Sequence, residues 1–137
     1  MGDRGQVRLI SQGDPDIYLY THWGATSLPG VVADALARGR DRWGDDEYLN
    51  RIIFSEMIKG EVMKNTGYGI GTALHSDTWL VVEVDHTNKT VAIKELAYDD
   101  WTGSSPEEVE EWVNSSHWKY EAEPTQFELF VAEHSII

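Results

Sequence analysis

The chain has 137 residues and a mass of 15.5 kDa, which is the size of one ordinary domain. Its formal net charge is −13, but 41% of its residues are hydrophobic and 11% are aromatic, which excludes a disordered chain. The absence of cysteine excludes disulfides, zinc–thiolate sites, iron–sulfur clusters and cysteine nucleophiles. Apolar runs are short and the first residues lack a secretory pattern, so we expect no membrane segment and a cytoplasmic location.

The charge is distributed unevenly along the chain. Residues 1–64 contain ten acidic and eight basic side chains, whereas residues 65–137 contain fourteen acidic and three basic ones. The acidic part repels phosphate backbones, so we expect no direct binding of nucleic acid. The arginines of the N-terminal part have two interpretations. They form a local basic patch for a small anionic molecule, or they are scattered over a solvated surface.

The chain is predicted to begin with an antiparallel hairpin. Residues 5–11 and 17–23 alternate between apolar and polar side chains, and the turn-rich segment Gly13-Asp14-Pro15-Asp16 separates them. Side chains alternate across a strand, so the second strand has two distinct faces. One face carries Tyr18, Tyr20 and His22, and the other carries Ile17, Leu19, Thr21 and Trp23. The alternation leaves open which of these faces the helices cover.

Two helices are predicted to follow the hairpin. Ser27 is an expected N-cap of the first helix, and Gly39 is expected to end it as a left-handed residue. The second helix is predicted from Asp45 or Asp46 to about residue 64, because acidic side chains favour a helix N-terminus and apolar residues then recur at helical spacing. The apolar stripe of this helix comprises Tyr48, Leu49, Ile52, Ile53, Met57 and Met63.

A glycine-rich segment and a second hairpin occupy the middle of the chain. Residues 67–71 contain three alternating glycines, which predict a loop or a bulged strand. Residues 79–84 and 90–96 are rich in strand-forming residues and are separated by a polar segment. They predict a hairpin whose turn is longer than two residues.

The acidic C-terminal region, residues 96–137, is predicted to add one helix and one strand. The segment Ser105-Pro106-Glu107-Glu108 has the N-cap, the first-position proline and the glutamate spacing of a capping box. Residues 127–132 alternate like a strand. The resulting order ββαα–ββ–α–β predicts a single α+β domain over residues 1–137, with helices packed against an antiparallel or mixed sheet.

Glu56 falls within the apolar stripe of the second predicted helix. An unpaired carboxylate in a core is costly, so this side chain needs a specific partner or a cavity. One interpretation is a structural ion pair with Arg4 or Arg51. The other is a carboxylate that faces a ligand or takes part in catalysis, with Gly60 leaving room beside it.

The face with Tyr18, Tyr20 and His22 is a candidate ligand-binding surface. In simple register it lies beside Arg4, Gln6 and Arg8 of the first strand. Guanidinium groups beside aromatic rings can neutralise and stack on a nucleotide-like anion, and the imidazole adds a hydrogen-bond donor or acceptor. The alternative interpretation is a polar sheet face that is exposed to water.

Other motifs of known chemistry do not occur in the sequence. The glycines of residues 67–71 match neither a Walker loop nor a Rossmann fingerprint, although their N–H groups and Tyr68 could face an anion. The histidines lack the spacing of a metal-binding helix, and no serine lies in a nucleophile elbow. We therefore expect no metal and no cofactor, and we favour a binding protein over an enzyme.

Several short strings of the chain together resemble those of a known family. They are Met1-Gly2-Asp3-Arg4, Ile17-Tyr18-Leu19-Tyr20-Thr21-His22-Trp23-Gly24, Arg42-Trp43, Tyr48-Leu49, Arg51-Ile52-Ile53-Phe54 and Thr66-Gly67-Tyr68-Gly69-Ile70. Through them, residues 1–95 resemble a family of small uncharacterised proteins of actinobacteria, their phages and other mobile elements. Where such proteins often have a second glycine after Trp-Gly, this chain has Ala25. The resemblance implies a mobile-element context, in which small proteins interfere with host defence or bind signalling nucleotides.

The leading hypothesis is a non-catalytic protein that binds a small nucleotide-like anion. The expected binding residues are Arg4, Tyr18, Tyr20, His22, Arg51, Glu56 and Tyr68. One alternative is an acidic protein-interaction module, or a nucleic-acid mimic that occupies a site on a host protein. Another is a small hydrolase in which His22 and Glu56 act as acid and base. All three hypotheses leave the oligomeric state open.

Overall fold

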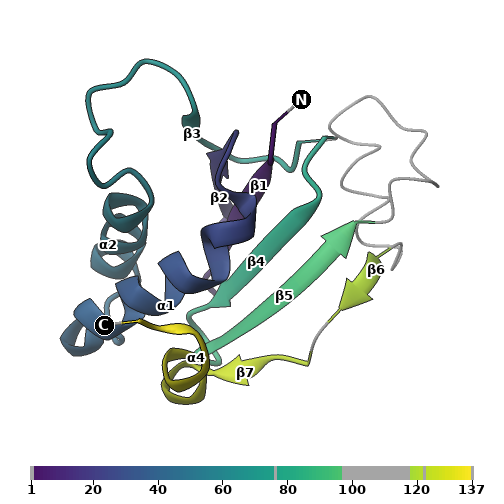
Figure 1. Ribbon diagram of the computed structural model, residues 1–137. Coiled ribbons are helices and arrows are strands. Elements are labelled where there is room, and N and C mark those ends of the chain that lie inside the picture. The colour runs from purple at the N-terminus through teal and green to yellow at the C-terminus, as the bar shows by residue number, and fades with distance from the viewer. Residues whose placement is uncertain (1, 76, 97–117, 122, 137) are drawn as a thin grey trace.

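A seven-stranded mixed sheet forms the centre of the computed structural model, which describes residues 2–75, 77–96, 118–121 and 123–136. The strands are β1 (Gly5–Ile10), β2 (Ile17–Thr21), β3 (Tyr68–Gly71), β4 (Leu80–Asp85), β5 (Thr90–Leu96), β6 (Trp118–Glu121) and β7 (Thr125–Gln126). Their order is β3-β2-β1-β4-β5-β6, and β7 pairs with the opposite end of β5 (Figure 1). The sheet therefore places the first strand of the chain near its middle.

β1 has a different kind of partner on each side. It pairs antiparallel with β2, with Val7 opposite Leu19, and parallel with β4, with Val7 opposite Val82. The predicted hairpin of residues 5–11 and 17–23 is confirmed as β1 and β2, and the second predicted hairpin as β4 and β5. The parallel pair makes the sheet mixed, so the predicted α+β fold is confirmed in its mixed form.

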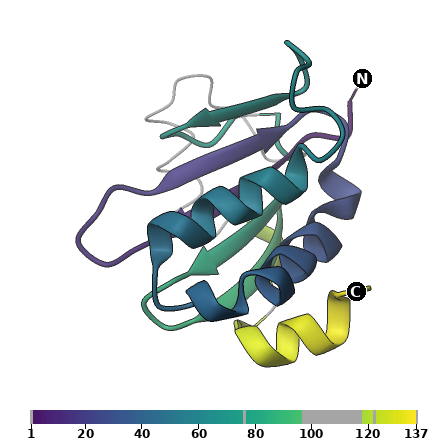
Figure 2. The ribbon, with the colours of Figure 1, turned by 90° about the vertical axis from the view of Figure 1, so that its left-hand side faces the viewer.

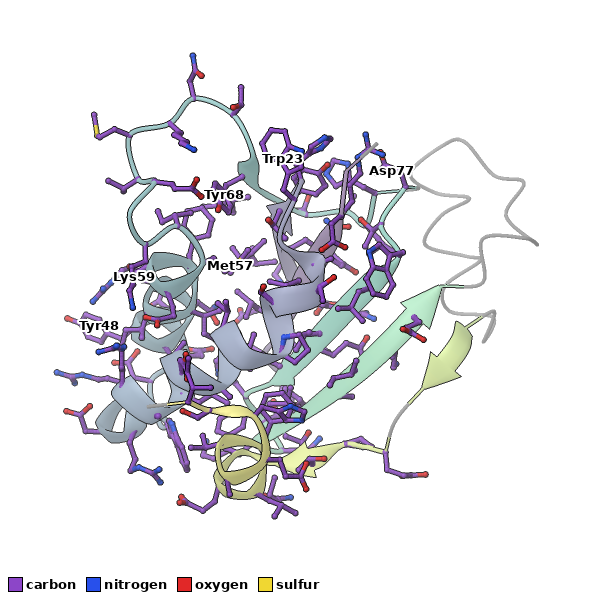
Figure 3. All side chains as sticks on the ribbon, in the orientation of Figure 1. Trp23, Tyr48, Met57, Lys59, Tyr68 and Asp77 are labelled. Atoms are coloured by element: carbon purple, nitrogen blue, oxygen red, sulfur yellow. The ribbon has the colours of Figure 1, made fainter. Side chains whose placement is uncertain are left out.

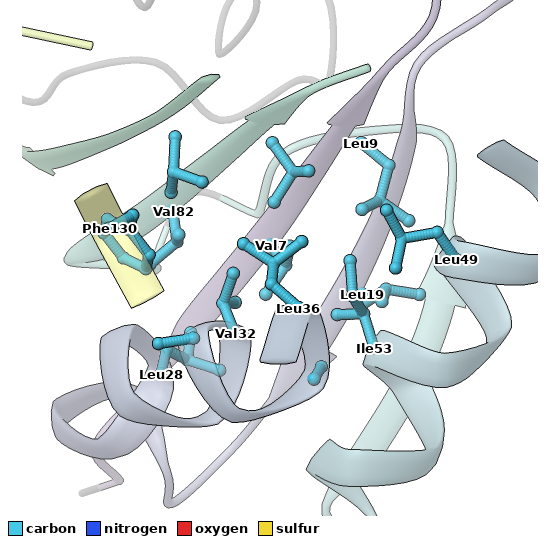
Figure 4. Packing of buried hydrophobic residues seen from close by; sticks show 14 of the residues in the cluster. Val7, Leu9, Leu19, Leu28, Val32, Leu36, Leu49, Ile53, Val82 and Phe130 are labelled. Atoms are coloured by element: carbon cyan, nitrogen blue, oxygen red, sulfur yellow. The ribbon is translucent and has the colours of Figure 1, made fainter. Parts of the chain in front are cut away.

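Helices α1 (Leu28–Arg38), α2 (Asp46–Met57) and α4 (Phe127–His134) lie on one face of the sheet (Figures 1 and 2). Short 3-10 turns, η1 (Ala25–Ser27) and η2 (Arg40–Arg42), precede α1 and α2. The apolar core lies between these helices and the sheet (Figure 4). Its buried members include Val7, Leu19, Val32, Leu36, Leu49, Ile53, Val82 and Phe130. The helices thus cover the face with Leu19, and Tyr18 and Tyr20 point to the opposite side, which we call the tyrosine face.

Close packing against α1 explains two glycines, Gly5 in β1 and Gly39 at the end of α1. A Cβ atom at Gly5 would lie 2.7 Å from the buried Cβ of Ala25 and 2.8 Å from Leu28 Cδ1, so the glycine lets α1 begin directly against β1. Gly39 has φ of −95°, so the prediction of a left-handed cap was wrong. A Cβ there would lie 2.9 Å from Leu49 Cδ1, so Gly39 instead allows α1 and α2 to approach.

The predicted boundaries of the two helices need two corrections, and one prediction is confirmed. Ser27 precedes α1 without a side-chain capping bond, because η1 already leads the chain into the helix. At α2, the Asp45 side chain does cap the helix by accepting a hydrogen bond from the Tyr48 N–H at 3.2 Å. The helix ends at Met57 rather than near residue 64, since Gly60 has φ of +82°, and Met63 is 91% exposed.

The prediction of a strand at residues 127–132 was wrong, because this segment is α4. Phe127 and Phe130 are both buried and lie three residues apart, while Leu129 is 55% exposed. That spacing fits a helix and not a strand, in which Phe127 and Leu129 would share a face. The helix predicted from Ser105 lies outside the described residues. In the described ranges, no helix has the length and apolar run needed to cross a bilayer.

Candidate functional site

Three of the seven predicted binding residues converge at the end of the β1–β2 hairpin. Arg4 Nε lies 3.3 Å from His22 Nδ1, and the Tyr20 hydroxyl oxygen lies 2.9 Å from the same nitrogen. The loop before β4 adds His75, whose ring is 4.7 Å from that of Tyr20, and Asp77, whose Oδ2 is 3.2 Å from Arg4 Nε. We call these five residues the Arg4 cluster. It joins a cation, a carboxylate and three aromatic rings in one place.

The contacts of Arg4 fix the orientation of the His22 ring. The Arg4 Nε–H group donates to His22 Nδ1, so Nδ1 acts as an acceptor and the neutral imidazole carries its proton on Nε2. The ring also meets Trp23 edge to face, with 4.5 Å between ring centroids. Trp23 is 62% exposed, so the cluster has a large aromatic surface facing water beside it (Figure 3). Such a surface can stack on a planar ligand.

Gln6 holds the loop that carries His75 and Asp77. This side chain is only 1% exposed. Its Nε2 donates to the carbonyl oxygen of Ala73, and its Oε1 accepts from the His75 N–H and the Thr78 hydroxyl, both at 2.8 Å. All three bonds cross from β1 to residues 73–78. A buried side chain of β1 therefore fixes the loop that contributes His75 and Asp77 to the Arg4 cluster.

Asp3 ties the beginning of the chain to the same region. Its carboxylate accepts hydrogen bonds from the N–H and hydroxyl groups of Thr26 and from Trp79 Nε1. Partial burial would raise the pKa of Asp3, but the bonds from Thr26 and Trp79 outweigh that effect and lower the pKa. The ionised carboxylate thus fixes the segment that leads into Arg4.

Tyr18 lies on the tyrosine face but belongs to a separate ionic network. The Arg8 guanidinium lies over its ring at 5.9 Å and pairs with Asp16 at 2.6 Å and Glu83 at 2.9 Å. Lys94 Nζ is 2.8 Å from the second oxygen of Glu83. Burial would lower the pKa of Arg8, but Tyr18 and the two carboxylates raise it. Each charge in this network has a partner of opposite sign. Tyr18 and Arg8 therefore have a structural role in the sheet and are not part of the Arg4 cluster.

Glu56 and Arg51 are on α2, away from the Arg4 cluster. The Glu56 side chain is 11% exposed and pairs with Arg38 at 3.3 Å and Lys59 at 3.6 Å. The structural interpretation of Glu56 therefore fits, but its partners differ from the predicted Arg4 and Arg51. Arg51 is exposed and contacts Ser55 at 3.3 Å. The structure does not bring Glu56 to His22, so it gives no support to an acid and base pair.

Tyr68 lies on the helix side of the sheet. It is opposite Thr21 in the β2–β3 register, whereas Gly69 is opposite Tyr20. Its hydroxyl donates to Glu61, and that bond is the main cause that raises the pKa of Tyr68 to about 12. The ring borders a cavity of about 170 Å³. The other lining residues are Thr21, Gly24, Ser27, Leu28, Val31 and Met57. Tyr68 is thus separate from the Arg4 cluster.

A larger cavity, of about 260 Å³, lies at the carboxyl ends of β1 and β4. It is lined by Ser11, Gln12, Trp43, Gly44, Asp46, His86, Thr87 and Lys89, and we call it the His86 cavity. Sequence reasoning missed it, because its walls come from three distant segments. The signal that could have found it is the parallel pairing of β1 and β4, which brings Ser11 and His86 to one edge of the sheet.

In the part of the chain that the structure describes, no three histidine, aspartate or glutamate side chains are grouped to hold a metal ion. Comparisons of the chain with protein-family models, with curated proteins and with solved structures found no match. Function is therefore inferred from the geometry of the two sites.

Proposed function

We propose that this chain is a non-catalytic binding protein, and that its Arg4 cluster holds a small aromatic anion of the nucleotide class. The observation that carries the proposal is the convergence of Arg4, Tyr20 and His22, with His75 and the exposed Trp23 beside them. A phosphate needs a cation with several N–H donors, and a guanidinium supplies them. A base needs a ring to stack on, which is worth about 1–3 kcal/mol for each base.

Asp77 competes with an anionic ligand for Arg4. Its side chain is 51% exposed and lies 3.2 Å from Arg4 Nε. A phosphate that binds the guanidinium has to displace this carboxylate or remain beside it, and both cost free energy. The same ion pair keeps Arg4 in place while the site is empty. Loss of the Arg4 charge should therefore weaken binding of the anion, whereas loss of the Asp77 charge should strengthen it.

The experiment is isothermal titration calorimetry with a panel of mono-, di- and cyclic nucleotides at 50 mM and 150 mM NaCl. We expect saturable heat with at least one nucleotide and weaker binding at the higher salt. Arg4→Gln should weaken this binding at least tenfold. Asp77→Asn should strengthen it severalfold, because it removes the competing charge.

Arg51→Gln is the matched control, because Arg51 is an exposed arginine outside the cluster. It should leave the affinity unchanged. Absence of heat with every nucleotide would contradict the proposal, as would equal losses in the Arg4 and Arg51 variants. Circular dichroism of each variant shows that a loss of binding does not come from unfolding.

The charge asymmetry favours a second candidate, an acidic module that occupies a site on a host protein. Residues 65–137 carry fourteen acidic and three basic side chains, and Glu123, Glu128 and Glu133 are exposed. The mobile-element context that the resemblance implies fits either candidate. The same calorimetry separates them, because a decoy for a host protein would bind none of the nucleotides.

A further inference from the structure

The His86 cavity is built on backbone pairing at the far end of β1 from the Arg4 cluster. The His86 N–H donates to the carbonyl oxygen of Ile10 at 2.9 Å, and the Gln12 N–H donates to the Thr87 hydroxyl at 3.0 Å. These bonds join the β1–β2 loop to the β4–β5 turn. The start of α2 closes the third side with Trp43 and Asp46. The cavity is thus held by three fixed elements.

His86, which lines this cavity, has a buried ring nitrogen without a partner. Its side chain is 7% exposed, and its Nε2 lies 2.6 Å from Asn50 Oδ1. The amide oxygen accepts, so Nε2 carries the proton and Nδ1 is a bare acceptor. Nδ1 has no hydrogen-bond partner among the described residues. Such an atom costs about 1–3 kcal/mol. Because Nδ1 is buried, a donor of a ligand reaches it only when the imidazole ring turns toward the cavity, and the new bond then recovers this cost.

Two opposite charges border the same cavity. Asp46 accepts a hydrogen bond from the Ser11 side chain, which is the main cause that lowers the pKa of Asp46 and keeps it ionised. Lys89 Nζ donates to the carbonyl oxygen of His86 at 3.3 Å, which brings the ammonium to the rim of the cavity. The cavity therefore has an acceptor-rich side and a cationic side.

Trp43 supplies an apolar wall. Its Nε1 donates to the carbonyl oxygen of Leu36 at 2.9 Å, so the polar atom of the indole is already satisfied. Arg40 lies over the ring at 4.9 Å, and Phe127 meets it edge to face at 5.3 Å. The ring is held firmly and can pack against an aliphatic or aromatic side chain.

From these groups we infer that the His86 cavity binds a small zwitterion of the amino-acid class. The ligand ammonium donates to Asp46 and to His86 Nδ1, the ligand carboxylate meets Lys89, and the ligand side chain lies against Trp43. The volume of about 260 Å³ corresponds to roughly nine water molecules at about 30 Å³ each, which suits a small amino acid. This site is independent of the proposed nucleotide site.

The test begins with calorimetric titration of the protein with each of the twenty amino acids. The best binder is then compared with the amine that lacks its carboxylate and with the acid that lacks its amino group. We expect the amine to bind at least tenfold more weakly than the amino acid, and the acid to give no saturation. If no amino acid binds, or if the acid binds as well as the amino acid, the inference is wrong.

Variants assign the binding to the cavity. Asp46→Asn should weaken the binding of the amino acid more than tenfold. Lys89→Met should lower the affinity for the amino acid to the affinity for the amine that lacks its carboxylate. Asp45 caps α2 independently, so the helix keeps its start in the Asp46 variant. Asp41→Asn, an exposed aspartate outside the cavity, is the control and should change nothing.

The nitrogen NMR chemical shifts of the His86 ring test whether this side chain contacts the ligand, because a purely structural role would leave them unchanged on binding. Binding should shift the Nδ1 resonance from the position of a free acceptor toward that of a hydrogen-bonded one. An unmoved resonance at saturation would overturn the role of His86. Unchanged affinity in Asp46→Asn would overturn the site itself. Neither result bears on nucleotide binding at the Arg4 cluster, because the two sites share no residue.

Discussion

His86 shows how burial determines the titration of a single side chain. Burial is the largest cause that lowers its pKa from 6.5, and Lys89 acts in the same direction, while Asp46 and Asp85 oppose it. The folded protein therefore binds fewer protons than the unfolded chain between the lowered pKa and pH 6.5. Stability that is present above pH 6.5 is lost as the pH falls through this window.

Urea unfolding of the wild type and of His86→Gln at pH 7.5 and pH 5.5 tests this expectation. The wild type should lose more unfolding free energy over the interval than the variant, by at most about 1.4 kcal/mol for each pH unit, the slope for one proton. Other groups titrate alike in both proteins, so the difference isolates His86. Parallel losses in the two proteins would show that burial does not perturb this imidazole.

For Glu56, the sequence predicts the need for an ionic partner but not which residue the partner is. Its place in an apolar stripe correctly indicates a side chain that needs an ionic partner. The partner Arg38 lies at the end of α1, and its closeness to α2 depends on packing around Gly39.

Tyr18 and Tyr20 are a second case in which the sequence predicts a position but not its contacts. The alternation predicts their common face, but Arg8 binds one and His22 the other.

At the scale of elements, two neighbouring side chains of α4 differ sharply in their exposure to solvent. Phe130 is 2% exposed and Leu129 is 55% exposed. Phe130→Ala should cost about 3–5 kcal/mol of unfolding free energy, because it removes a buried ring and leaves a cavity. Leu129→Ala should change it by roughly 0.5 kcal/mol or less. Urea unfolding at pH 7.5 measures both, and the reverse order would indicate a strand with Leu129 inside.

Local signals explain which elements the sequence predicts well. The turn around Gly13 and Pro15 specifies the first hairpin, and Asp45 specifies the start of α2. The alternation of residues 127–132 misleads, because apolar residues recur there at both spacings: positions 127, 129 and 131 fit a strand, and positions 127, 130 and 131 fit a helix. The parallel pairing of β1 with β4 has no local signal at all. The His86 cavity depends on that pairing, so it was not predictable from local patterns.

At the scale of the whole molecule, self-repulsion opposes folding. The net charge is −13, of which ion pairs such as those of Glu83 and Glu56 offset only local charge. Raising NaCl from 20 mM to 200 mM should screen this repulsion more than it weakens half-buried pairs. We expect Tm to rise by roughly 3 °C, which is the shift for about 1 kcal/mol in a domain of this size.

Scanning calorimetry across a NaCl series measures this effect. Near pH 5 the net charge approaches zero, since the sequence pI is about 4.6, and the dependence on salt should nearly vanish there. A Tm that falls with salt at pH 7.5 would mean that attractive pairs dominate the electrostatic free energy of the fold.

The central place of β1 also has a consequence during synthesis. Gly5 pairs with Leu80, so the ribosome must add a long stretch of chain before the parallel partner exists. At roughly 5–20 residues per second, that takes several seconds. In this interval the hairpin of β1 and β2 exposes the backbone edge that the finished protein hides, and the nascent chain is most vulnerable to mispairing with its neighbours.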